Sequence, residues 1–438
     1  MTAAATRPAS LVTEALGIGV HVTPAAGAAR FADALELGLR RNPKRAQLLV
    51  SRVLGKHIPA PACEVLEAAA MLGAAVREQC GGQVPVVVGF AETATGLGHG
   101  VAASCGPDGA GAPYLHTTRR PAPGGVHVVR FTEDHSHATD QALALTSDEH
   151  MRGGRPLVLV DDELSTGNTA VNAIRAIQAR WPRDRYVLAS LADCREAARR
   201  DEVSAAVRAL GAEVVSVSLL NAEVTLPDGA LRAAMQFMET IPAPPDGPGA
   251  CGRAGSAPVP VNWTNLTLPA GVPALGAAGW EPGQEQAARA AMTAAASSLP
   301  VPADSRTLVL GDEELMYVPQ LLAAELGPDV RTSATTRTPA VVIDRPGYPL
   351  RSVLRFGSTE DGERPAYAYN VAPCARSQAR PGLDGQNAPG FDHIVLVTDA
   401  PRGPRTAGVV AALAVSAAAG VHVLTLSRAG QEDRHGAG

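Results

Sequence analysis

One stretch, residues 157–169, constrains this chain more than any other, and it reads Leu-Val-Leu-Val-Asp-Asp-Glu-Leu-Ser-Thr-Gly-Asn-Thr. The four leading apolar residues predict a short buried strand, and residues 170–179 carry apolar side chains at helical spacing. The polar loop at 165–169 therefore runs into a helix N-terminus, where unpaired backbone N–H groups and the positive end of the helix dipole favour an anion. A phosphate monoester is the ligand that best fits such a loop.

Two adjacent carboxylates, Asp161 and Asp162, follow the strand directly. Neighbouring anions repel each other and are tolerated where a cation or several hydroxyl donors lie near them. A sugar phosphate meets both needs, because its phosphate enters the loop while its vicinal hydroxyls donate to the carboxylates. The alternative is an ordinary strand-loop-helix with a polar turn, which the specificity of the motif disfavours.

The stretch resembles the phosphoribosyl-pyrophosphate signature of the type I phosphoribosyltransferases: an apolar strand, an acidic doublet, an apolar pair and a Ser/Thr-Thr-Gly-x-Thr loop. The resemblance implies that Asp161 and Asp162 hold the ribose hydroxyls and act as catalytic candidates. Glu163 departs from the pattern, so it adds a third carboxylate beside the ribose or turns to solvent. The residues expected to grip the 5′-phosphate are Ser165, Thr166, Gly167, Asn168 and Thr169.

A second strand-loop-helix unit precedes the signature. Residues 84–89 are rich in valine and predict a buried strand, and residues 97–103 predict a small-residue helix. In the type I phosphoribosyltransferases a unit at this position forms the pyrophosphate loop, although a plain strand-to-helix connection is the alternative here. The carboxylate of Glu92 requires Mg²⁺ or a basic residue between it and a pyrophosphate. The implied loop residues are Glu92, Thr93, Ala94, Thr95 and Gly96.

Basic residues offer further phosphate contacts. Residues 30–39 predict a helix, and the basic cluster after it includes Arg45, with Lys56 further along the chain. Either residue is a candidate phosphate contact, and a solvated helix end is the alternative.

Residues 113–118 and 126–131 flank a Pro/Gly-rich turn, which predicts a β-hairpin with Arg119 and Arg120 at its tip. Both arginines are candidates for neutralising pyrophosphate.

The loop at residues 132–139 contains His135 and His137, which are candidates for proton handling or pyrophosphate contact. The resemblance implies a mobile loop here that closes over substrate and excludes water. A solvated loop without a catalytic role is an equal alternative.

Two later pieces resemble the TRSP domain: residues 311–319 and the Thr-Arg-Thr-Pro sequence at 336–339. That domain follows a phosphoribosyltransferase domain in bacterial proteins of tellurite-resistance and stress gene clusters. The resemblance makes Arg337 a candidate ligand contact, and a structural turn in which Arg337 caps a helix is the alternative.

The alternating strands and helices predict an α/β fold, with a type I phosphoribosyltransferase parallel sheet covered by helices on both faces and a second, smaller α/β domain after it. The expected divisions are a loose N-terminal arm (1–29), the phosphoribosyltransferase domain (30–240), a Pro/Gly-rich linker (241–262) and the TRSP-like domain (263–438). The units at 307–326 and 394–418 occur in the same order as the two units of the first half. We interpret this order as coincidence rather than as a degenerate copy.

Composition excludes several classes. The net charge of −5 gives no case for nucleic acid as a partner, and no apolar run reaches membrane-spanning length. The six scattered cysteines indicate reduced thiols, so we expect a cytoplasmic protein. A homodimer is one arrangement consistent with the sequence.

The function expected from the resemblance is transfer of ribose phosphate from phosphoribosyl pyrophosphate to a small nucleobase-like acceptor in a stress or tellurite-resistance pathway. Mg²⁺ is the expected cofactor, held mainly by the ligand near Asp161 and Asp162 rather than by a protein metal site. A non-catalytic sensor of phosphoribosyl pyrophosphate or nucleotide is the alternative, and a scaffold with a vestigial site is a third interpretation.

Overall fold

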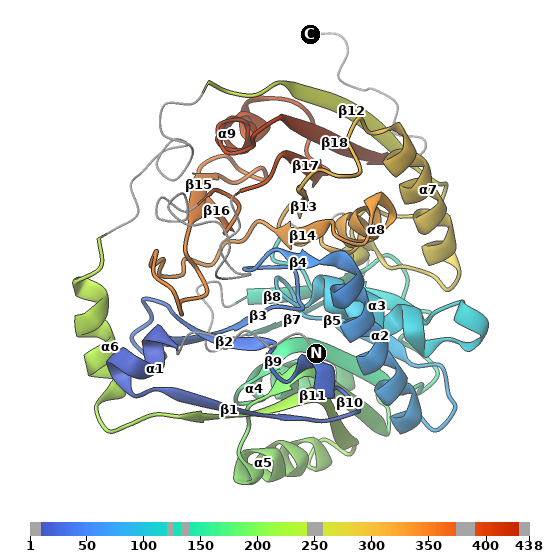
Figure 1. Ribbon diagram of the computed structural model, residues 1–438. Coiled ribbons are helices and arrows are strands. Elements are labelled where there is room, and N and C mark those ends of the chain that lie inside the picture. Colours follow the sequence, from blue (N-terminus) through green and yellow to red (C-terminus); the bar gives the residue numbers. More distant parts are fainter. Residues whose placement is uncertain (1–9, 121–126, 133–139, 243–256, 374–389, 429–438) are drawn as a thin grey trace, which may run out of the picture.

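The computed structural model describes residues 10–120, 127–132, 140–242, 257–373 and 390–428. It contains two six-stranded sheets (Figure 1). The first sheet has the order β1 (Gly19–Pro24), β11 (Glu213–Thr225), β10 (Arg185–Asp193), β9 (Leu157–Leu164), β5 (Val86–Gly89) and β6 (Tyr114–His116). The strands from β11 to β6 are parallel, and β1 is antiparallel to β11. The carboxyl ends of β5 and β9 therefore meet at one edge, as the α/β prediction requires.

The continuous apolar runs of β5 and β9 are buried because helices cover both faces of the first sheet. Val87 and Val158 pack toward α2 (Ala62–Gln79) and α3 (Thr95–Cys105). Val86 and Leu157 pack on the opposite face, where α4 (Asn168–Gln178) and α5 (Ala197–Arg208) lie. Alternate residues of each strand therefore belong to two separate hydrophobic cores, one on each face of the sheet.

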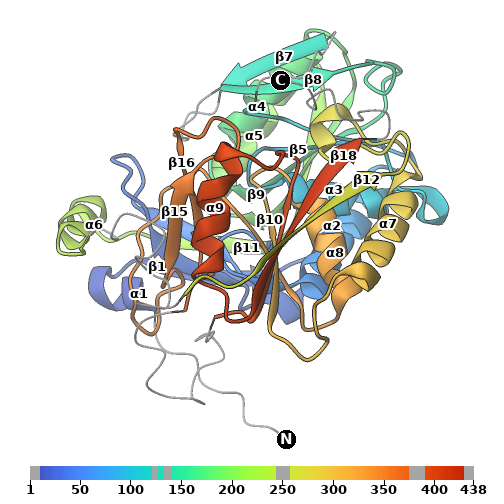
Figure 2. The same ribbon diagram turned by 90° about the horizontal axis from the view of Figure 1, so that it is seen from above.

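The second sheet has the order β12 (Val261–Leu268), β18 (Gly420–Arg428), β17 (His393–Thr398), β13 (Thr307–Gly311), β14 (Arg331–Ala334) and β4 (Ala60–Pro61). Its helices are α7 (Gln284–Ser298), α8 (Tyr317–Leu326) and α9 (Pro404–Ala414). Figure 2 shows α9 and β15 (Val353–Gly357) on one side of β18, and α7 and α8 on the other. No helix in the described ranges is long and apolar enough to cross a membrane.

The two halves share one hydrophobic core. Buried side chains of α2 and α3 belong to the same cluster as those of α7 and α8, together with the facing sides of both sheets. In addition, β4 comes from the first half of the chain but forms the edge of the second sheet, where Ala60 pairs with Thr332. The two halves therefore pack directly against each other and are not joined by a linker alone.

The helix predicted at residues 30–39 is wrong. Only the short 3-10 turn η1 (Ala29–Phe31) is helical, and β2 (Leu35–Leu39) pairs antiparallel with β3 (Gln47–Ser51). The leucines at 35, 37 and 39 alternate with Glu36 and Gly38, and this period of two fits a strand. The spacing of four between Phe31, Leu35 and Leu39 fits a helix equally well, so the pattern was ambiguous.

The hairpin predicted from residues 113–118 and 126–131 is also wrong. The first of these segments, β6, is buried and continues the parallel sheet beside β5. The second, β7 (His127–Thr132), pairs instead with β8 (Asp140–Leu145). The loop between β7 and β8, which carries His135 and His137, lies outside the described residues.

Parts of the expected arm and linker belong to the sheets. Residues 11–24 are not a loose arm, because α1 (Leu11–Leu16) shares an apolar cluster with β2 and α6 (Ala230–Glu239) and β1 pairs with β11. Strand β12 begins within the expected linker and pairs in parallel with β18. Helix α6 follows β11 and ends just before the expected linker. In the second half, β15 and β16 (Pro365–Tyr369) form an antiparallel hairpin.

We predict that Gly311→Ala lowers the free energy of unfolding by about 1–3 kcal/mol, the usual range for overpacking. A Cβ at this strand end would lie 2.2 Å from the backbone oxygen of Leu315, which cannot move aside cheaply. Gly408→Ala is the matched control, because Gly408 is exposed in α9 and its Cβ would make only ordinary contacts at 3.9 Å. Urea titration should show the control unchanged or up to about 1 kcal/mol more stable. Equal stability of the two variants would contradict the packing argument.

Candidate functional site

A crevice opens at the carboxyl edge of the first sheet, where β9 and β5 end side by side. The residues that β9, the next loop and α4 contribute to its wall are Asp161, Asp162, Glu163, Leu164, Ser165, Thr166, Gly167, Thr169 and Ala170. The remaining walls consist of Arg40, Arg45, Leu48, Leu49, His57, Phe90, Ala91, Glu92, Thr93, Arg119, Gln141 and Thr338. The structure thus brings the acidic doublet, the signature loop and part of the loop after β5 into one place.

The signature loop is held in a conformation that only glycine adopts easily. Gly167 has φ 78° and ψ 2° at the start of α4, and a Cβ there would lie 2.8 Å from Cγ2 of Val203. The N–H of Asn168 donates to Oγ1 of Thr166 at 3.3 Å. The first turn of α4 contains no acidic residue, so nothing in that turn opposes an anion at the helix N-terminus.

Asn168 is the one predicted loop residue that does not line the crevice. Its side-chain oxygen instead accepts a hydrogen bond from Nη2 of Arg199 at 3.4 Å, on the side of α5.

The acidic doublet lies half-buried in the crevice wall. The N–H of Asp162 donates to Oδ1 of Asp161 at 3.0 Å. Glu163 also lines the crevice, where it forms an ion pair with Arg45 from the loop between β2 and β3. Of the two expectations for Glu163, the structure therefore supports a third carboxylate beside the doublet, with its charge balanced by Arg45.

Glu92 is neutralised by a basic residue, Lys56. Nζ of Lys56 lies 2.6 Å from Oε1 of Glu92, and the two side chains are 1% and 3% exposed. Burial alone raises the pKa of Glu92, but the nearby Lys56, Arg119 and Arg337 outweigh it and lower that pKa to about 2. Lys56 is thus committed to Glu92 and does not line the crevice.

The rest of the loop after β5 turns away from the crevice. Thr93 lines it, but Ala94, Thr95 and Gly96 do not. Oγ1 of Thr95 donates to the backbone oxygen of Glu314 at 3.0 Å, and a Cβ on Gly96 would meet the side chain of Gln320 at 2.6 Å. The back of this loop therefore packs on the second half of the chain.

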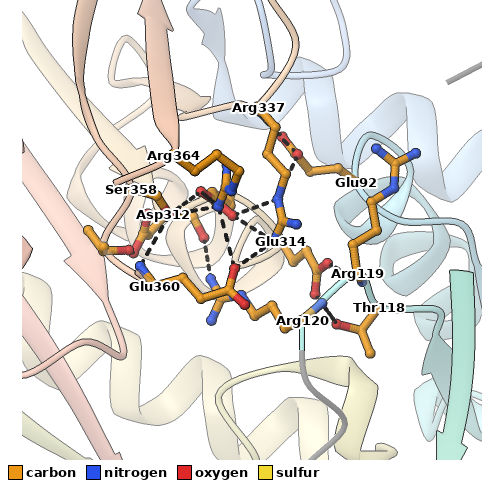
Figure 3. A network of polar contacts seen from close by, with 12 residues as sticks. Glu92, Thr118, Arg119, Arg120, Asp312, Glu314, Arg337, Ser358, Glu360 and Arg364 are labelled. Carbon is orange, nitrogen blue, oxygen red and sulfur yellow. Dashed lines mark hydrogen bonds and ion pairs between the residues drawn. The ribbon is translucent and has the colours of Figure 1, made fainter. Parts of the chain in front are cut away.

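Three consecutive acidic residues after β13 form the centre of a buried polar network (Figure 3). Asp312, Glu313 and Glu314 are at most 2% exposed. Arg337 pairs with Glu313 at 3.0 Å and with Glu360 at 2.8 Å, and its N–H donates to Glu92 at 3.3 Å. Arg337 therefore lies between the two halves, paired with acidic residues, and it is not among the residues that line the crevice.

The two neighbouring arginines after β6 point to different places. Arg119 lines the crevice, and its N–H donates to Oε1 of Glu314 at 2.9 Å. Arg120 does not line it. Nη1 of Arg120 donates to the two carboxylate oxygens of Asp399 at 3.1 and 3.2 Å, and Nη2 donates to the backbone oxygen of Asp312.

Several crevice residues carry no motif that would have identified them. His57, whose pKa is lowered to about 4 by burial and by Lys56, is neutral near pH 7. Arg40 and Gln141 come from segments that the sequence did not assign to a site, and Thr338 comes from the second half of the chain. Among the residues that the structure describes, no group of three or more His, Cys, Asp or Glu side chains could hold a metal ion.

Comparisons with known proteins agree with this division into halves. Residues 34–223 match the model of a phosphoribosyl transferase family, and residues 275–413 match the TRSP domain found C-terminal to that family. The chain therefore contains a phosphoribosyltransferase-family domain followed by a TRSP domain. No curated protein matches the chain in sequence.

Solved structures of adenine phosphoribosyltransferases are distantly similar to the first half. The enzyme from Rhodothermus marinus is 20% identical with a TM-score of 0.32, over 44% of this chain and 97% of that one. The enzyme from Giardia lamblia, in complex with 9-deazaadenine, is 18% identical with a TM-score of 0.31, over 44% of this chain and 96% of that one. Similarity at this level does not identify an acceptor for this chain.

We predict that Glu92→Gln destabilises the protein by about 3–5 kcal/mol at pH 7, because it leaves the buried Lys56 ammonium without a counter-charge. The pKa of Glu92 in the folded protein, about 2, lies below its usual 4.5. The ion pair therefore contributes stability above pH 4.5 that is lost as the pH falls toward 2.

Urea titrations from pH 7 to pH 3 should accordingly show the difference between parent and Glu92→Gln shrinking below pH 4.5. The double variant Lys56→Met, Glu92→Gln serves as the control and should recover part of the loss, because it removes both charges. A difference that does not change with pH would contradict the assigned pKa.

Proposed function

We propose that the crevice binds phosphoribosyl pyrophosphate with Mg²⁺ and that the protein transfers the ribose 5-phosphate to a nucleobase-like acceptor. We further propose that this reaction serves a bacterial stress or tellurite-resistance pathway and takes place in the cytoplasm. The observation that carries the proposal is that the signature loop, the acidic doublet and the start of the loop after β5 all line one crevice. The family match over residues 34–223 supports it.

Each part of the crevice has a separate role in this proposal. The backbone around Gly167 and the hydroxyls of Ser165 and Thr169 hold the 5′-phosphate at the helix N-terminus. Asp161 and Asp162 accept hydrogen bonds from the ribose hydroxyls. Fixing the sugar at both ends removes most of the orientational freedom that the reaction would otherwise have to overcome.

In the chemical step, the bond from C1 of the ribose to pyrophosphate breaks, and pyrophosphate leaves with the electron pair. The acceptor nitrogen forms the new bond to C1 and releases its proton. Either carboxylate of the doublet would stabilise positive charge on the ribose ring or take that proton. His135 and His137 remain candidates for proton handling.

Pyrophosphate needs positive charge near it, and Arg119 is the predicted arginine that lines the crevice. Arg40 and Arg45 add two guanidinium groups from the β2–β3 hairpin, although Arg45 already pairs with Glu163. Mg²⁺ would be held mainly by ligand oxygens near Asp161 and Asp162, because this ion usually keeps ligand phosphates and water in its coordination shell. Bound there, the ion would neutralise charge on the pyrophosphate.

The chemistry of the acceptor is suggested by the apolar residues in the crevice wall. Leu48, Leu49 and Phe90 line the crevice, and Arg40, which carries hydrogen-bond donors, lines it as well. A flat heterocycle suits such a wall. Adenine, the base named for the similar solved enzymes, is the first acceptor to test.

A sensor that binds the sugar phosphate without turnover is the second candidate function. The pyrophosphate side of the crevice contains Glu92, and the ribose side contains the additional Glu163. Both carboxylates are paired with basic residues, Lys56 and Arg45, which reduces the net positive charge available to a leaving pyrophosphate. Binding without release would fit this balance.

Incubation of the purified protein with labelled phosphoribosyl pyrophosphate, Mg²⁺ and a panel of nucleobases separates the two functions. We expect Mg²⁺-dependent release of pyrophosphate that requires one acceptor. The double variant Asp161→Asn, Asp162→Asn should bind at least tenfold more weakly, equivalent to about 1.4 kcal/mol, because it loses both ribose-binding carboxylates.

Asp201→Asn, on the exposed surface of α5, is the matched control and should behave like the parent. Saturable binding without release would support the sensor instead. Parent-like binding and release by the doublet variant would refute the proposed role of the doublet.

A further inference from the structure

The core of the second sheet has the same strand order as the core of the first. Strands β10, β9, β5 and β6 lie side by side in parallel, as do β18, β17, β13 and β14. The connections also agree, because α2 and α7 precede the first strands, α3 and α8 follow them, and a hairpin separates β6 from β9 and β14 from β17. Such agreement in order and connection is more than two α/β domains need to share.

The agreement extends to single hydrogen bonds beyond the strand ends. The N–H of Thr117 donates to the backbone oxygen of Gly89 at 2.9 Å, and that of Thr335 donates to Gly311 at 2.9 Å. Both halves of the chain read Thr-Thr-Arg at this point. The residues at 117–119 and 335–337 are therefore equivalent.

The next residues agree as well. The N–H of Arg120 donates to Oγ1 of Thr118 at 3.0 Å, and that of Thr338 donates to Oγ1 of Thr336 at 3.2 Å. Thr118 forms an antiparallel bridge to β8, and Thr336 forms one to β16. Arg120 of the first half thus corresponds to Thr338 of the second.

The loops after β5 and β13 correspond in the same way. The N–H of Ala91 donates to Oγ1 of Thr117 at 2.8 Å. In the same way, the N–H of Glu313 donates to Oγ1 of Thr335 at 2.9 Å. The residues that follow, Glu92 and Glu314, are therefore equivalent.

The equivalent residues contact each other reciprocally across the interface. The N–H of Arg119 donates to Glu314 at 2.9 Å, and the N–H of Arg337 donates to Glu92 at 3.3 Å (Figure 3). The edges of the two sheets are exchanged in the same manner. Strand β4 of the first half pairs with β14 of the second half, and Trp280, which precedes α7 in the second half, pairs with Tyr114 of β6 in the first half. The two halves face each other as the subunits of a two-fold symmetric dimer do.

The second half has its own carboxylate at the position equivalent to Asp162, and that carboxylate is already paired. Gly89 pairs with Val160 and Gly311 pairs with Val397, so Asp162 and Asp399 lie two residues beyond equivalent positions. The carboxylate of Asp399 accepts two hydrogen bonds from Arg120 of the first half.

The phosphate-binding loop also differs between the halves. Where the first half has Ser-Thr-Gly at 165–167, the second has Arg-Gly-Pro at 402–404. Pro404 begins α9 and has no backbone N–H to offer an anion.

We propose that the second half is an internal, closed copy of the first and acts as its built-in partner, and that Thr338 keeps the first crevice open. Thr338 is the counterpart of Arg120 as Asp162 is the counterpart of Asp399, and Thr338 and Asp162 both line the crevice. Arg337 is a positioning residue that holds Glu92 from across the interface. The identity of the ligand in this inference rests on the proposed function, but the internal repeat does not.

The test is Thr338→Arg, which gives the first crevice the arginine that closes the second. We expect its guanidinium to pair with Asp162, so that binding of phosphoribosyl pyrophosphate with Mg²⁺ weakens at least tenfold in calorimetry. The parent should bind one ligand per chain. Ala294→Arg, on the exposed face of α7, is the control for an added arginine and should bind like the parent.

A thermal measurement needs no ligand. The melting temperature of Thr338→Arg should rise relative to the parent, and the rise should vanish in an Asp162→Asn background. If the arginine variant does not fold, Thr338→Lys provides the same test with a more flexible cation.

The outcomes distinguish the two proposals. If the parent binds and Thr338→Arg binds equally well, the inference is overturned while the proposed function stands. If the parent does not bind phosphoribosyl pyrophosphate, the proposed function fails, and the melting temperatures decide the inference alone. A melting temperature of Thr338→Arg that does not depend on Asp162 would overturn it.

Discussion

The structure depends on the neutralisation of carboxylates that are buried between its two halves. Glu92 and Glu314 lie beyond equivalent strand ends, and each accepts a hydrogen bond from a backbone N–H of the opposite half. A buried carboxylate without such partners would be strongly destabilising. Lys56 of the first half pairs with Glu92, and Arg364 of the second half pairs with Glu313, so each acidic loop is satisfied by partners from both halves together.

This constraint explains why the site and the second domain are inseparable. The loop after β5 has one surface toward the crevice, at Thr93, and another toward the second half, at Thr95. Contacts with the second half therefore support the conformation of this loop. The shared core of α2, α3, α7 and α8 adds a large apolar contact to the polar one, so the interface resembles the interior of a single domain.

Sequence reasoning succeeded where one local pattern was sufficient. The strands β5 and β9 and the helices α3 and α4 lie close to where they were predicted, because long apolar runs and helical spacing are strong signals. It failed at β2, where alternating leucines fitted two periods, and at β6, whose partner is distant in sequence. Lys56 was expected near a phosphate, yet its burial against Glu92 could only be seen in three dimensions.

The sequence by itself determined the chemistry of the signature: an acidic doublet, a polar glycine-containing loop, and a helix start suited to an anion. These properties arise within a few consecutive residues, so they need no distant contact. Only the tertiary structure decided which arginines face the crevice, because Arg119 and Arg120 are neighbours in the chain but diverge to a ligand wall and to Asp399. The physical reason is that burial and charge pairing depend on residues hundreds of positions apart, whose approach no local pattern encodes.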